Sequence, residues 1–271
     1  MKVLIAGAAG RIGQVLCEGL AGRGHTVIGL DKVAVDSRHT RWHQVDCRDA
    51  AAVRSIFEIE QPEAVIHLAG HPGETSLPAA LESHAITTLA LLEASVAQRV
   101  RRFVYASSNH AVGYHPRTEV LPVDAPHRPD TFYGVSKVTA EALLSLYADR
   151  YGLSTIACRI GSFRSEPDSR RALSTWLSHA DCVRMFDACL TASTTGFVVI
   201  YGISANSRAW WDLDPGRALG YLPQDDAEVF ADRLPARPDD DAEAMHVGGL
   251  YATERTGRPA FDDAPNRGDR P

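Results

Sequence analysis

Short apolar runs alternate with longer amphipathic segments over the first two thirds of the chain. The runs are rich in β-branched residues, as in TVIGL and AVIHL, and this is typical of buried strands. They predict strands at Lys2–Ala6, Thr26–Leu30, Ala64–Leu68, Phe103–Ala106 and Ser154–Arg159, and helices at about Arg11–Ala21, Asp49–Glu58, Ala79–Gln98 and Tyr133–Tyr151. Because repeated strand–helix–strand units with right-handed crossovers build a parallel sheet covered on both faces, we expect an α/β fold with a Rossmann-type doubly wound sheet.

The pattern loosens after Gly161. A helix is predicted at Ser174–Leu190 and a further strand at Phe197–Tyr201, and the segment from Trp210 has the character of a smaller lobe. From about Arg233 the chain is rich in Pro, Asp and Arg, which is typical of mobile segments. We therefore predict a dinucleotide-binding core at 1–162 with a returning strand at 196–201, a small, mostly C-terminal substrate lobe at 163–260, and a mobile tail at 261–271.

Charge and composition exclude several classes of partner. The net charge is −6, from 28 basic and 34 acidic residues, and no run of Lys or Arg suggests a basic face. Binding to nucleic acid or to an anionic membrane surface is therefore not expected.

Targeting and redox signals indicate a cytoplasmic, soluble protein. Arg11 and several glycines interrupt the apolar character of the first segment, so it does not resemble a signal peptide. The uncharged stretch from Ala188 to Ser207 is too polar for a membrane span. The five cysteines contain no Cys-x-x-Cys pair, and such an odd, scattered set is typical of reduced thiols.

A glycine-rich loop follows the first predicted strand and opens the first predicted helix. It reads Gly7-Ala8-Ala9-Gly10-Arg11-Ile12-Gly13. In this context the first two glycines permit a tight turn and close approach to a pyrophosphate, and Gly13 permits close packing of helix and strand. The alternative is that the glycines only shape a turn, but the strand–loop–helix context favours a dinucleotide site, in which Arg11 and Ile12 supply backbone contacts.

Acidic residues after the next strands indicate which dinucleotide binds. Asp31 ends the second strand, where a carboxylate can accept hydrogen bonds from the ribose hydroxyls and repel a 2′-phosphate, so NAD is favoured over NADP. Lys32 and Arg38 instead favour NADP, since a nearby cation can accommodate the 2′-phosphate. Asp46, in the segment VDCRD, is either an adenine contact or a helix N-cap. Leu68 and Ala69, at the end of the strand Ala64–Leu68, are also expected at the cofactor.

Tyr133 and Lys137 are the candidate catalytic pair. Residues four apart share one face of a helix, so the Lys137 ammonium can stabilise the Tyr133 phenolate, which otherwise forms only near pH 10. Ser107 and Ser108 end the strand before this helix, and a serine hydroxyl there can hold the substrate oxygen that loses its proton. Strand alternation favours Ser108, although the phase is ambiguous at a strand end.

Together these motifs resemble those of the extended short-chain dehydrogenase/reductase family, also known as the NAD-dependent epimerase/dehydratase family. Longer blocks are similar to the uronate dehydrogenases within it: YASSNHAVGY, YGVSK, RIGS, LSTWLSH and GISANSRAWWD. This resemblance implies oxidation of the C1 hydroxyl of a hexuronic acid, such as galacturonate or glucuronate, to an aldarolactone with NAD as acceptor. It also implies that Tyr133 is the base and Lys137 its activator, and that Ser108, Asn109, His110, Ser162 and Arg171 bind the sugar acid.

The chemistry of the residues agrees in part with that resemblance. A bidentate arginine suits a carboxylate, and Arg171 follows a strand at the ligand-binding edge, although it can also be a solvated loop residue with Arg164 and Arg170 as competitors. His67 and His71 have a metal-like spacing, but no carboxylate or cysteine completes a site, so no metal is expected.

Two segments depart from the uronate dehydrogenase pattern. The loop His71–Ser76 is longer than the corresponding segment of that pattern, which contributes a substrate contact. In this loop only Thr75 or Ser76 can supply a hydroxyl for such a contact. His84 replaces an asparagine that supports the active-site geometry. The alternatives to a uronate dehydrogenase are a sugar or sugar-nucleotide epimerase or reductase of the same superfamily, and a non-catalytic dinucleotide-sensing protein. Self-association into a homo-oligomer is expected from the family.

Overall fold

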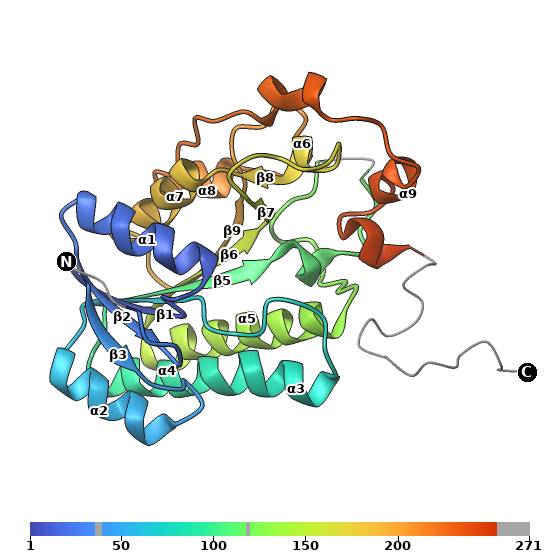
Figure 1. Cartoon of the computed structure of the whole chain (residues 1–271). Coiled ribbons are helices and arrows are strands. Elements are labelled where there is room, and N and C mark those ends of the chain that lie inside the picture. Colours follow the sequence, from blue (N-terminus) through green and yellow to red (C-terminus); the bar gives the residue numbers. More distant parts are fainter. Residues whose placement is uncertain (36–39, 118–119, 254–271) are drawn as a thin grey trace, which may run out of the picture.

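The computed structural model describes residues 1–35, 40–117 and 120–253. Its centre is a seven-stranded parallel sheet with the strand order β3-β2-β1-β4-β5-β6-β9 (Figure 1). The strands are β1 (Lys2–Ala6), β2 (Thr26–Asp31), β3 (Arg41–Gln44), β4 (Ala64–His67), β5 (Arg102–Ser108), β6 (Ser154–Ile160) and β9 (Phe197–Gly202). The predicted doubly wound parallel sheet is confirmed.

Helices cover both faces of this sheet (Figure 1). One face carries α1 (Arg11–Gly22), α7 (His179–Thr191) and α8 (Asp214–Ala218); the other carries α2 (Ala50–Glu60), α3 (Leu77–Leu81), the π-helical turn η1 (Glu82–Ile86), α4 (Thr87–Ala97) and α5 (Phe132–Tyr151). Alternate residues of a strand point to opposite faces, so Val3 and Ile5 belong to the first core and Leu4 to the second. This two-sided burial explains why the strands read as continuous apolar runs.

The strand order reverses between β1 and β4, which are direct neighbours. In open parallel sheets such a reversal leaves a crevice outside the carboxyl ends of the strands, and ligands bind there. The loops after β1, β2, β4, β5 and β6 all emerge at this edge.

The predicted helix at Ala79–Gln98 is interrupted by the π-helical turn η1. The hydroxyls of Thr87 and Thr88 both donate to the carbonyl of His84, at 3.1 Å and 2.6 Å. Hydroxyls that compete in this way for helix carbonyls disturb the regular ladder, and π-helical turns are frequent at functional sites. The turn carries His84, one of the two departures noted in the sequence.

The prediction of a single helix at Ser174–Leu190 is wrong. The segment begins with the short helix α6 (Ala172–Thr175), continues in β8 (Trp176–Leu177), which pairs with β7 (Ser162–Phe163), and becomes α7 only at His179. The Trp176 carbonyl accepts hydrogen bonds from the Ser204 backbone and the Asn206 side chain, so tertiary contacts hold it extended. The Ser178 hydroxyl then caps α7 by accepting from the Asp181 backbone.

The remaining described elements lie beyond the carboxyl edge of the sheet. They are η2 (Asn109–Val112), η3 (Ala227–Arg233), α9 (Asp240–Ala244) and η4 (Gly249–Ala252). Around them Trp210, Trp211 and Tyr201 form a separate apolar cluster with Val247. The predicted tail at 261–271 lies outside the described residues.

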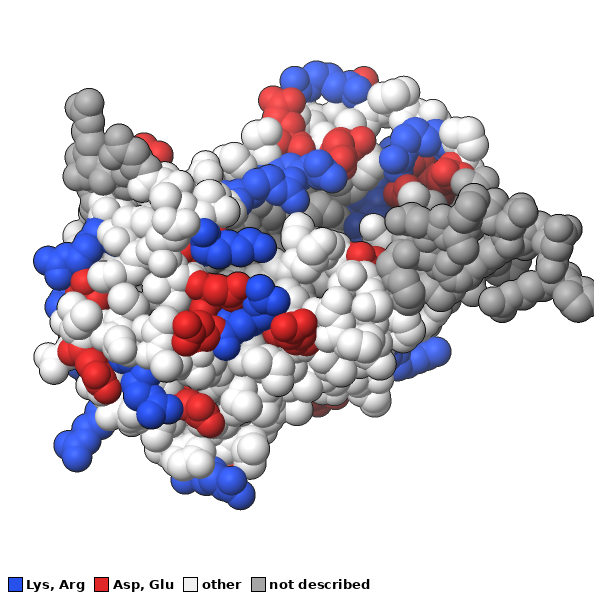
Figure 2. Space-filling model, turned by 60° about the horizontal axis from the view of Figure 1, so that its bottom comes forward, with Lys and Arg blue, Asp and Glu red and all other residues white. Residues whose placement is uncertain are grey.

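The surface carries charges of both signs, and the thiols are buried. On the face that Figure 2 shows, basic side chains lie among acidic ones, without a continuous basic field among its described residues. All five cysteines are buried free thiols. Within the described ranges, no helix combines the length and the apolar character that a membrane crossing requires.

Candidate active site

Two adjoining cavities, of about 530 Å³ and 430 Å³, lie at the carboxyl edge of the sheet. Both are lined by Gly7, Gly10 and Leu68, so a dinucleotide fits along the pair. Arg11, Ile12, Gly13, Tyr133 and Lys137 line the first cavity, and Asp31, Asp46 and Ala69 line the second. Every residue expected at the cofactor therefore lies at one of the two cavities.

The glycine loop fits a pyrophosphate. Gly7 has φ of +85°, and a Cβ atom added to it would lie 2.5 Å from the Ala69 nitrogen. A Cβ on Gly13 would lie 2.5 Å from the Gly7 oxygen, so this glycine is needed for close packing of α1. Helix α1 has neither a side-chain cap at Gly10 nor an acidic residue in its first turn. Its first amides and the positive end of its dipole are therefore available to an anion.

The second cavity holds the two acidic residues predicted at the adenosine. Asp31 accepts hydrogen bonds from the backbone nitrogens of Ala9, at 3.0 Å, and Val33, at 3.1 Å, so it also fixes the glycine loop. Asp46 is bound by the Arg48 guanidinium, and the cap of α2 is Asp49. The N-cap alternative for Asp46 is thus wrong, and its contact with adenine stays a prediction.

We predict that Asp31→Asn weakens the preference for NAD over NADP by at least about tenfold, measured as the ratio of kcat/KM values. The substitution removes the charge that repels a 2′-phosphate and keeps an oxygen for the Ala9 amide, and repulsion between like charges costs several kcal/mol. Asp46→Asn is the control, because Arg48 already compensates the Asp46 charge in the same cavity. An unchanged ratio in Asp31→Asn would contradict the prediction.

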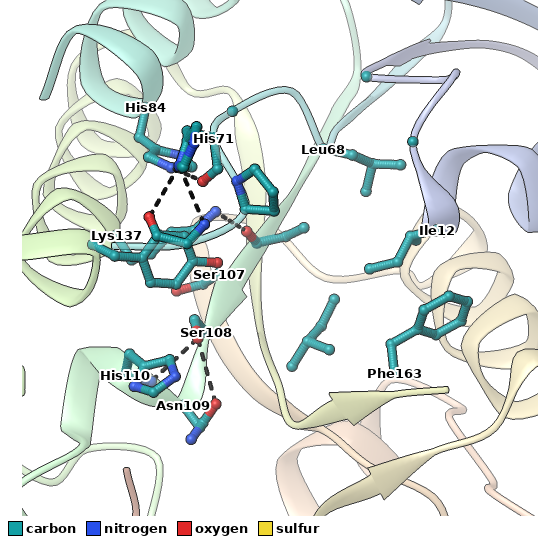
Figure 3. Close-up of a pocket in the computed structure, with 18 of the residues that line it drawn as sticks. Ile12, Leu68, His71, His84, Ser107, Ser108, Asn109, His110, Lys137 and Phe163 are labelled. Carbon is teal, nitrogen blue, oxygen red and sulfur yellow. Dashed lines mark hydrogen bonds between the residues drawn. The ribbon is translucent and has the colours of Figure 1, made fainter. Parts of the chain in front are cut away.

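Tyr133 and Lys137 converge near the start of α5, as the spacing predicts. The Lys137 Nζ lies 5.2 Å from the Tyr133 ring centroid and donates to the Ala106 carbonyl at 2.8 Å. The Ser108 side chain lies close enough to the Tyr133 phenol to lower its pKa. Figure 3 shows Lys137 and Ser108 at the same cavity.

Burial opposes the charge on both members of the pair. It raises the pKa of Tyr133 to about 12, against the opposite effect of the Ser108 hydrogen bond. It lowers the pKa of Lys137 to about 7, against the opposite effect of the Glu141 carboxylate. The phenolate therefore needs nearby positive charge, which Lys137 and a cationic cofactor ring can supply.

The neighbouring serine, Ser107, is occupied elsewhere. Its hydroxyl donates to Glu141 of α5 at 2.5 Å, and Glu141 is also bound by Arg159 of β6 at 2.8 Å and by His127 at 2.9 Å. Glu141 and Arg159 are 1% and 2% exposed. This buried network joins α5 to β5 and β6, and it leaves Ser108 as the serine beside Tyr133.

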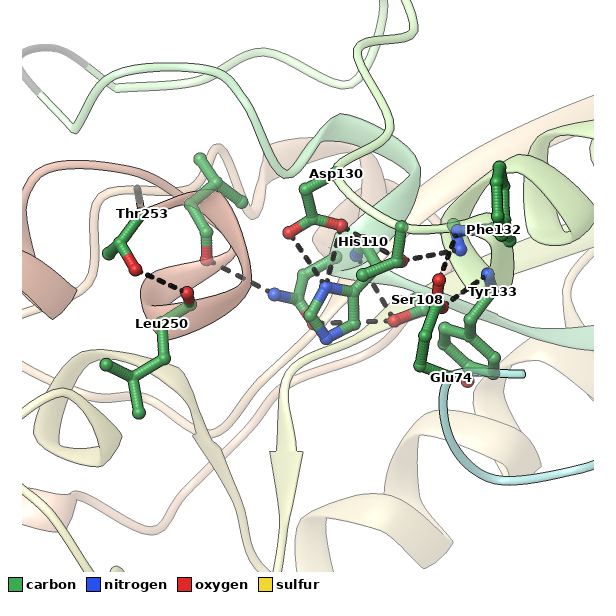
Figure 4. Close-up of polar contacts among 12 residues, drawn as sticks. Glu74, Ser108, His110, Asp130, Phe132, Tyr133, Leu250 and Thr253 are labelled. Carbon is green, nitrogen blue, oxygen red and sulfur yellow. Dashed lines mark hydrogen bonds and ion pairs between the residues drawn. The ribbon is translucent and has the colours of Figure 1, made fainter. Parts of the chain in front are cut away.

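His110 and Asn109 follow Ser108 in η2, and both line the first cavity. The His110 Nδ1 lies 2.9 Å from both carboxylate oxygens of the buried Asp130 (Figure 4). The His110 ring packs edge-on against the rings of Tyr133 and Tyr251. Because the Asp130 carboxylate occupies Nδ1, Nε2 is the ring nitrogen left for another partner.

Two of the expected substrate residues are not among those that line the cavity. Ser162 shares a hydrogen bond of 2.9 Å with Thr175, and the Arg171 Nη2 donates to the Val247 carbonyl at 2.6 Å. The same carbonyl accepts from the Asn109 side chain at 3.2 Å. The segment before η4 therefore bridges Arg171 to the cavity wall, and the roles of Ser162 and Arg171 stay predictions.

The two departures from the family pattern are physically connected. The loop after β4 brings Glu74 to α5, where its oxygens accept from the backbone nitrogens of Phe132 and Tyr133, both at 2.9 Å (Figure 4). The His84 Nε2 holds the same loop by its contact with the His71 carbonyl at 2.9 Å, and the His84 ring packs edge-on against Tyr133. Burial, with the nearby Lys137 charge, lowers the pKa of His84 to about 2, so this imidazole is neutral.

The expected hydroxyl of the β4 loop is not at the first cavity: Thr75 lines the second cavity, and Ser76 is not among the residues around either one. The sequence reasoning also missed Glu74, Asp130 and Tyr251. Only the proximity of Asp130 to Tyr133 in the sequence was a possible signal. Within the described ranges, no three His, Cys, Asp or Glu side chains are grouped to hold a metal, and His67 is bonded to Thr88.

Comparison with known proteins agrees with this geometry. The NAD dependent epimerase/dehydratase family matches residues 3–195. Uronate dehydrogenases from Pseudomonas syringae pv. tomato and Agrobacterium fabrum are 35% and 37% identical; each alignment covers 92% of this chain, and 92% and 96% of the respective relative. A mutant uronate dehydrogenase from Agrobacterium tumefaciens, solved in complex with NAD, is 37% identical with a TM-score of 0.86, and the match covers 93% of this chain and 96% of that one. The chain therefore belongs to the NAD dependent epimerase/dehydratase family and, within it, to the uronate dehydrogenases.

Proposed function

We propose that the protein is an NAD-dependent dehydrogenase that oxidises the C1 hydroxyl of a hexuronic acid, D-galacturonate or D-glucuronate, to the aldarolactone. The convergence of Tyr133, Lys137 and Ser108 beside a dinucleotide cavity carries this proposal. The similarity to uronate dehydrogenases over 92% of the chain supports the choice of substrate.

The chain's own side chains hold the reacting oxygen and move its proton. Ser108 and Tyr133 hold the C1 oxygen by hydrogen bonds, and the Tyr133 phenolate accepts the hydroxyl proton. The Lys137 ammonium stabilises the phenolate. NAD, when bound, supplies the acceptor for the hydride from C1 and a positive charge near the base. The glycine loop, the first turn of α1, Asp31, Leu68 and Ala69 hold the cofactor, with Asp46 at the adenine.

Oxidation at C1 of a ring sugar gives a lactone directly, because the carbon already carries the ring oxygen. Asn109, His110 and Ser162 bind the sugar hydroxyls, and Arg171 binds the carboxylate. The contact of Arg171 and Asn109 with one shared carbonyl supports their acting on the same ligand.

The decisive experiment is an NADH absorbance assay with galacturonate, glucuronate, galactose and a UDP-sugar, each with NAD and with NADP. We expect turnover of a uronate with NAD and lactone as the first product. Conversion of the UDP-sugar without turnover of either uronate would favour the epimerase or reductase alternative; it is followed by analysis of the sugar product, because an epimerase regenerates its NAD and gives no net absorbance change. Cofactor binding without turnover of any sugar would favour a dinucleotide sensor.

Two further expectations belong to this proposal. The unpaired cysteines support a cytoplasmic location. Self-association into a homo-oligomer, which gel filtration with light scattering measures, stays a prediction.

A further inference from the structure

A second arginine lies beside Arg171. Arg117 follows Pro116, which bridges to His246, so Arg117 and Arg171 are both attached to the segment that leads into η4. The Arg117 Nη2 donates to the Ser174 hydroxyl at 3.3 Å, and the Ser174 backbone nitrogen donates to the Arg171 carbonyl at 3.0 Å. The Arg117 guanidinium also lies over the Trp210 ring, 4.7 Å from its centroid. Arg117 therefore reaches the same turn of α6 that Arg171 begins.

This pair of cations is close to the sugar-binding wall. Arg171 and Asn109 donate to the same Val247 carbonyl at 2.6 Å and 3.2 Å, so their two nitrogens lie within about 6 Å of each other. Asn109 lines the cavity that holds Tyr133. The segment against Arg171 is short of side chains: Gly248 and Gly249 follow Val247, and a Cβ on Gly249 would lie 2.5 Å from the Arg171 Nε.

Neither guanidinium group has a carboxylate at ion-pair distance among residues 1–35, 40–117 and 120–253, although Glu243, Asp130 and Asp168 act on Arg171 from farther away. Neither forms an ion pair there, although eighteen ion pairs connect other side chains of the same residues. The Nε atoms of both arginines are buried without a hydrogen-bond acceptor in that part of the chain. The carboxylates nearest to Arg171 are engaged: Asp130 with His110, Glu243 with Arg237, and Asp168 with Arg164.

Such an arrangement is unfavourable without a ligand. Burial and the positive charge of Arg171 lower the pKa of Arg117 to about 10. A half-buried cation without a counter-charge in contact is costly, and two neighbouring cations repel each other. An anion that approaches both guanidinium groups offsets their desolvation and reduces the repulsion between them.

We propose that Arg117 is a specificity-determining residue that acts with Arg171 to receive the carboxylate of the sugar acid. The inference rests on the proposed function and assigns one more residue to its substrate end. The C1 end of the sugar is held at Tyr133 and Ser108, and the carboxylate end faces the two arginines across Asn109.

The test compares galacturonate with galactose, which has a neutral CH2OH group in place of the carboxylate. Arg117→Gln is expected to lower kcat/KM for galacturonate about tenfold to a hundredfold, mainly through KM, because a hydrogen bond to a charged group is lost. The value for galactose should change less than about twofold, because binding of a neutral C6 group uses no charge. Arg117→Lys keeps the positive charge and should fall between the wild type and Arg117→Gln.

Arg164→Gln is the matched control, since Arg164 is an exposed arginine directly after β7 whose ion pair among the described residues is with Asp168. The dissociation constant of galacturonate, measured by calorimetry in a Tyr133→Phe background with NAD present, repeats the test without turnover. Equal losses for both sugars, or an unchanged galacturonate value in a folded variant, would overturn the inference. Failure of the wild type to oxidise any uronate would instead overturn the proposed function.

Discussion

Tyr133→Phe is expected to lower kcat by about 10³-fold or more while the affinity for NAD changes little. Catalysis by a positioned acid or base contributes about 10² to 10⁴ in rate, and phenylalanine keeps the ring that packs against His84 and His110. Steady-state kinetics with galacturonate measures the loss, and the quenching of protein fluorescence by NADH measures cofactor binding.

The pH dependence adds a second readout of the same residue. Burial raises the pKa of Tyr133 to about 12, so the phenol is protonated at neutral pH. Rising pH and nearby positive charge both favour the phenolate. The kcat/KM of the wild type should therefore rise with pH as long as Lys137, whose pKa burial lowers to about 7, keeps its charge, and the residual rate of Tyr133→Phe should lose this rising limb. Tyr151→Phe is the control, because Tyr151 is 50% exposed on the same helix. Retained activity in Tyr133→Phe would identify another base.

Glu141→Ala is expected to destabilise the protein by about 3 to 5 kcal/mol, since removing one partner leaves the buried Arg159 cation uncompensated. For a chain of this size that corresponds to a fall in Tm of about 10 °C. Thermal and urea unfolding measure the change. Asp149→Ala, an exposed acidic residue of the same helix, should shift stability by less than about 0.5 kcal/mol.

Acid unfolding provides an independent check on Glu141. Burial raises its pKa, but hydrogen bonds from His127 and Arg159 outweigh burial and lower it from 4.5 to about 2. A carboxyl group with a depressed pKa stabilises the folded state above its unfolded pKa, and this stabilisation is lost as the pH falls through the folded value. The wild type should therefore lose stability between about pH 4.5 and 2, and Glu141→Ala should lose less there. A parallel loss in both proteins would show that Glu141 does not carry this dependence.

The sequence predicts the fold well where local pattern and burial agree. The strands of the core are apolar on both faces, so their composition alone identifies them. The edge strand β3, with sequence RWHQ, has no such pattern, and its bounds could not be predicted. The helix expected across Trp176 fails for a related reason, because contacts with Ser204 and Asn206 decide its conformation.

The site residues likewise differ in whether local sequence or long-range contacts place them. The glycine loop and the Tyr133–Lys137 pair depend on short-range spacing, so they can be read from the chain. Glu74 lies about sixty residues before the helix that it caps, and Arg117 meets Ser174 at a similar separation. No periodicity encodes such contacts, and only the folded chain brings them together.

The five buried cysteines can report how the folded protein opens. Burial raises the pKa of Cys17 to about 11 and that of Cys47 to about 12, so both remain protonated thiols at neutral pH. A thiol reagent needs both access and a thiolate, and the native state provides neither. Labelling should therefore proceed only as molecules transiently unfold, in the manner of amide hydrogen exchange. Mass spectrometry of the modified chains would then distinguish the local release of a single cysteine from a global event that exposes all five together.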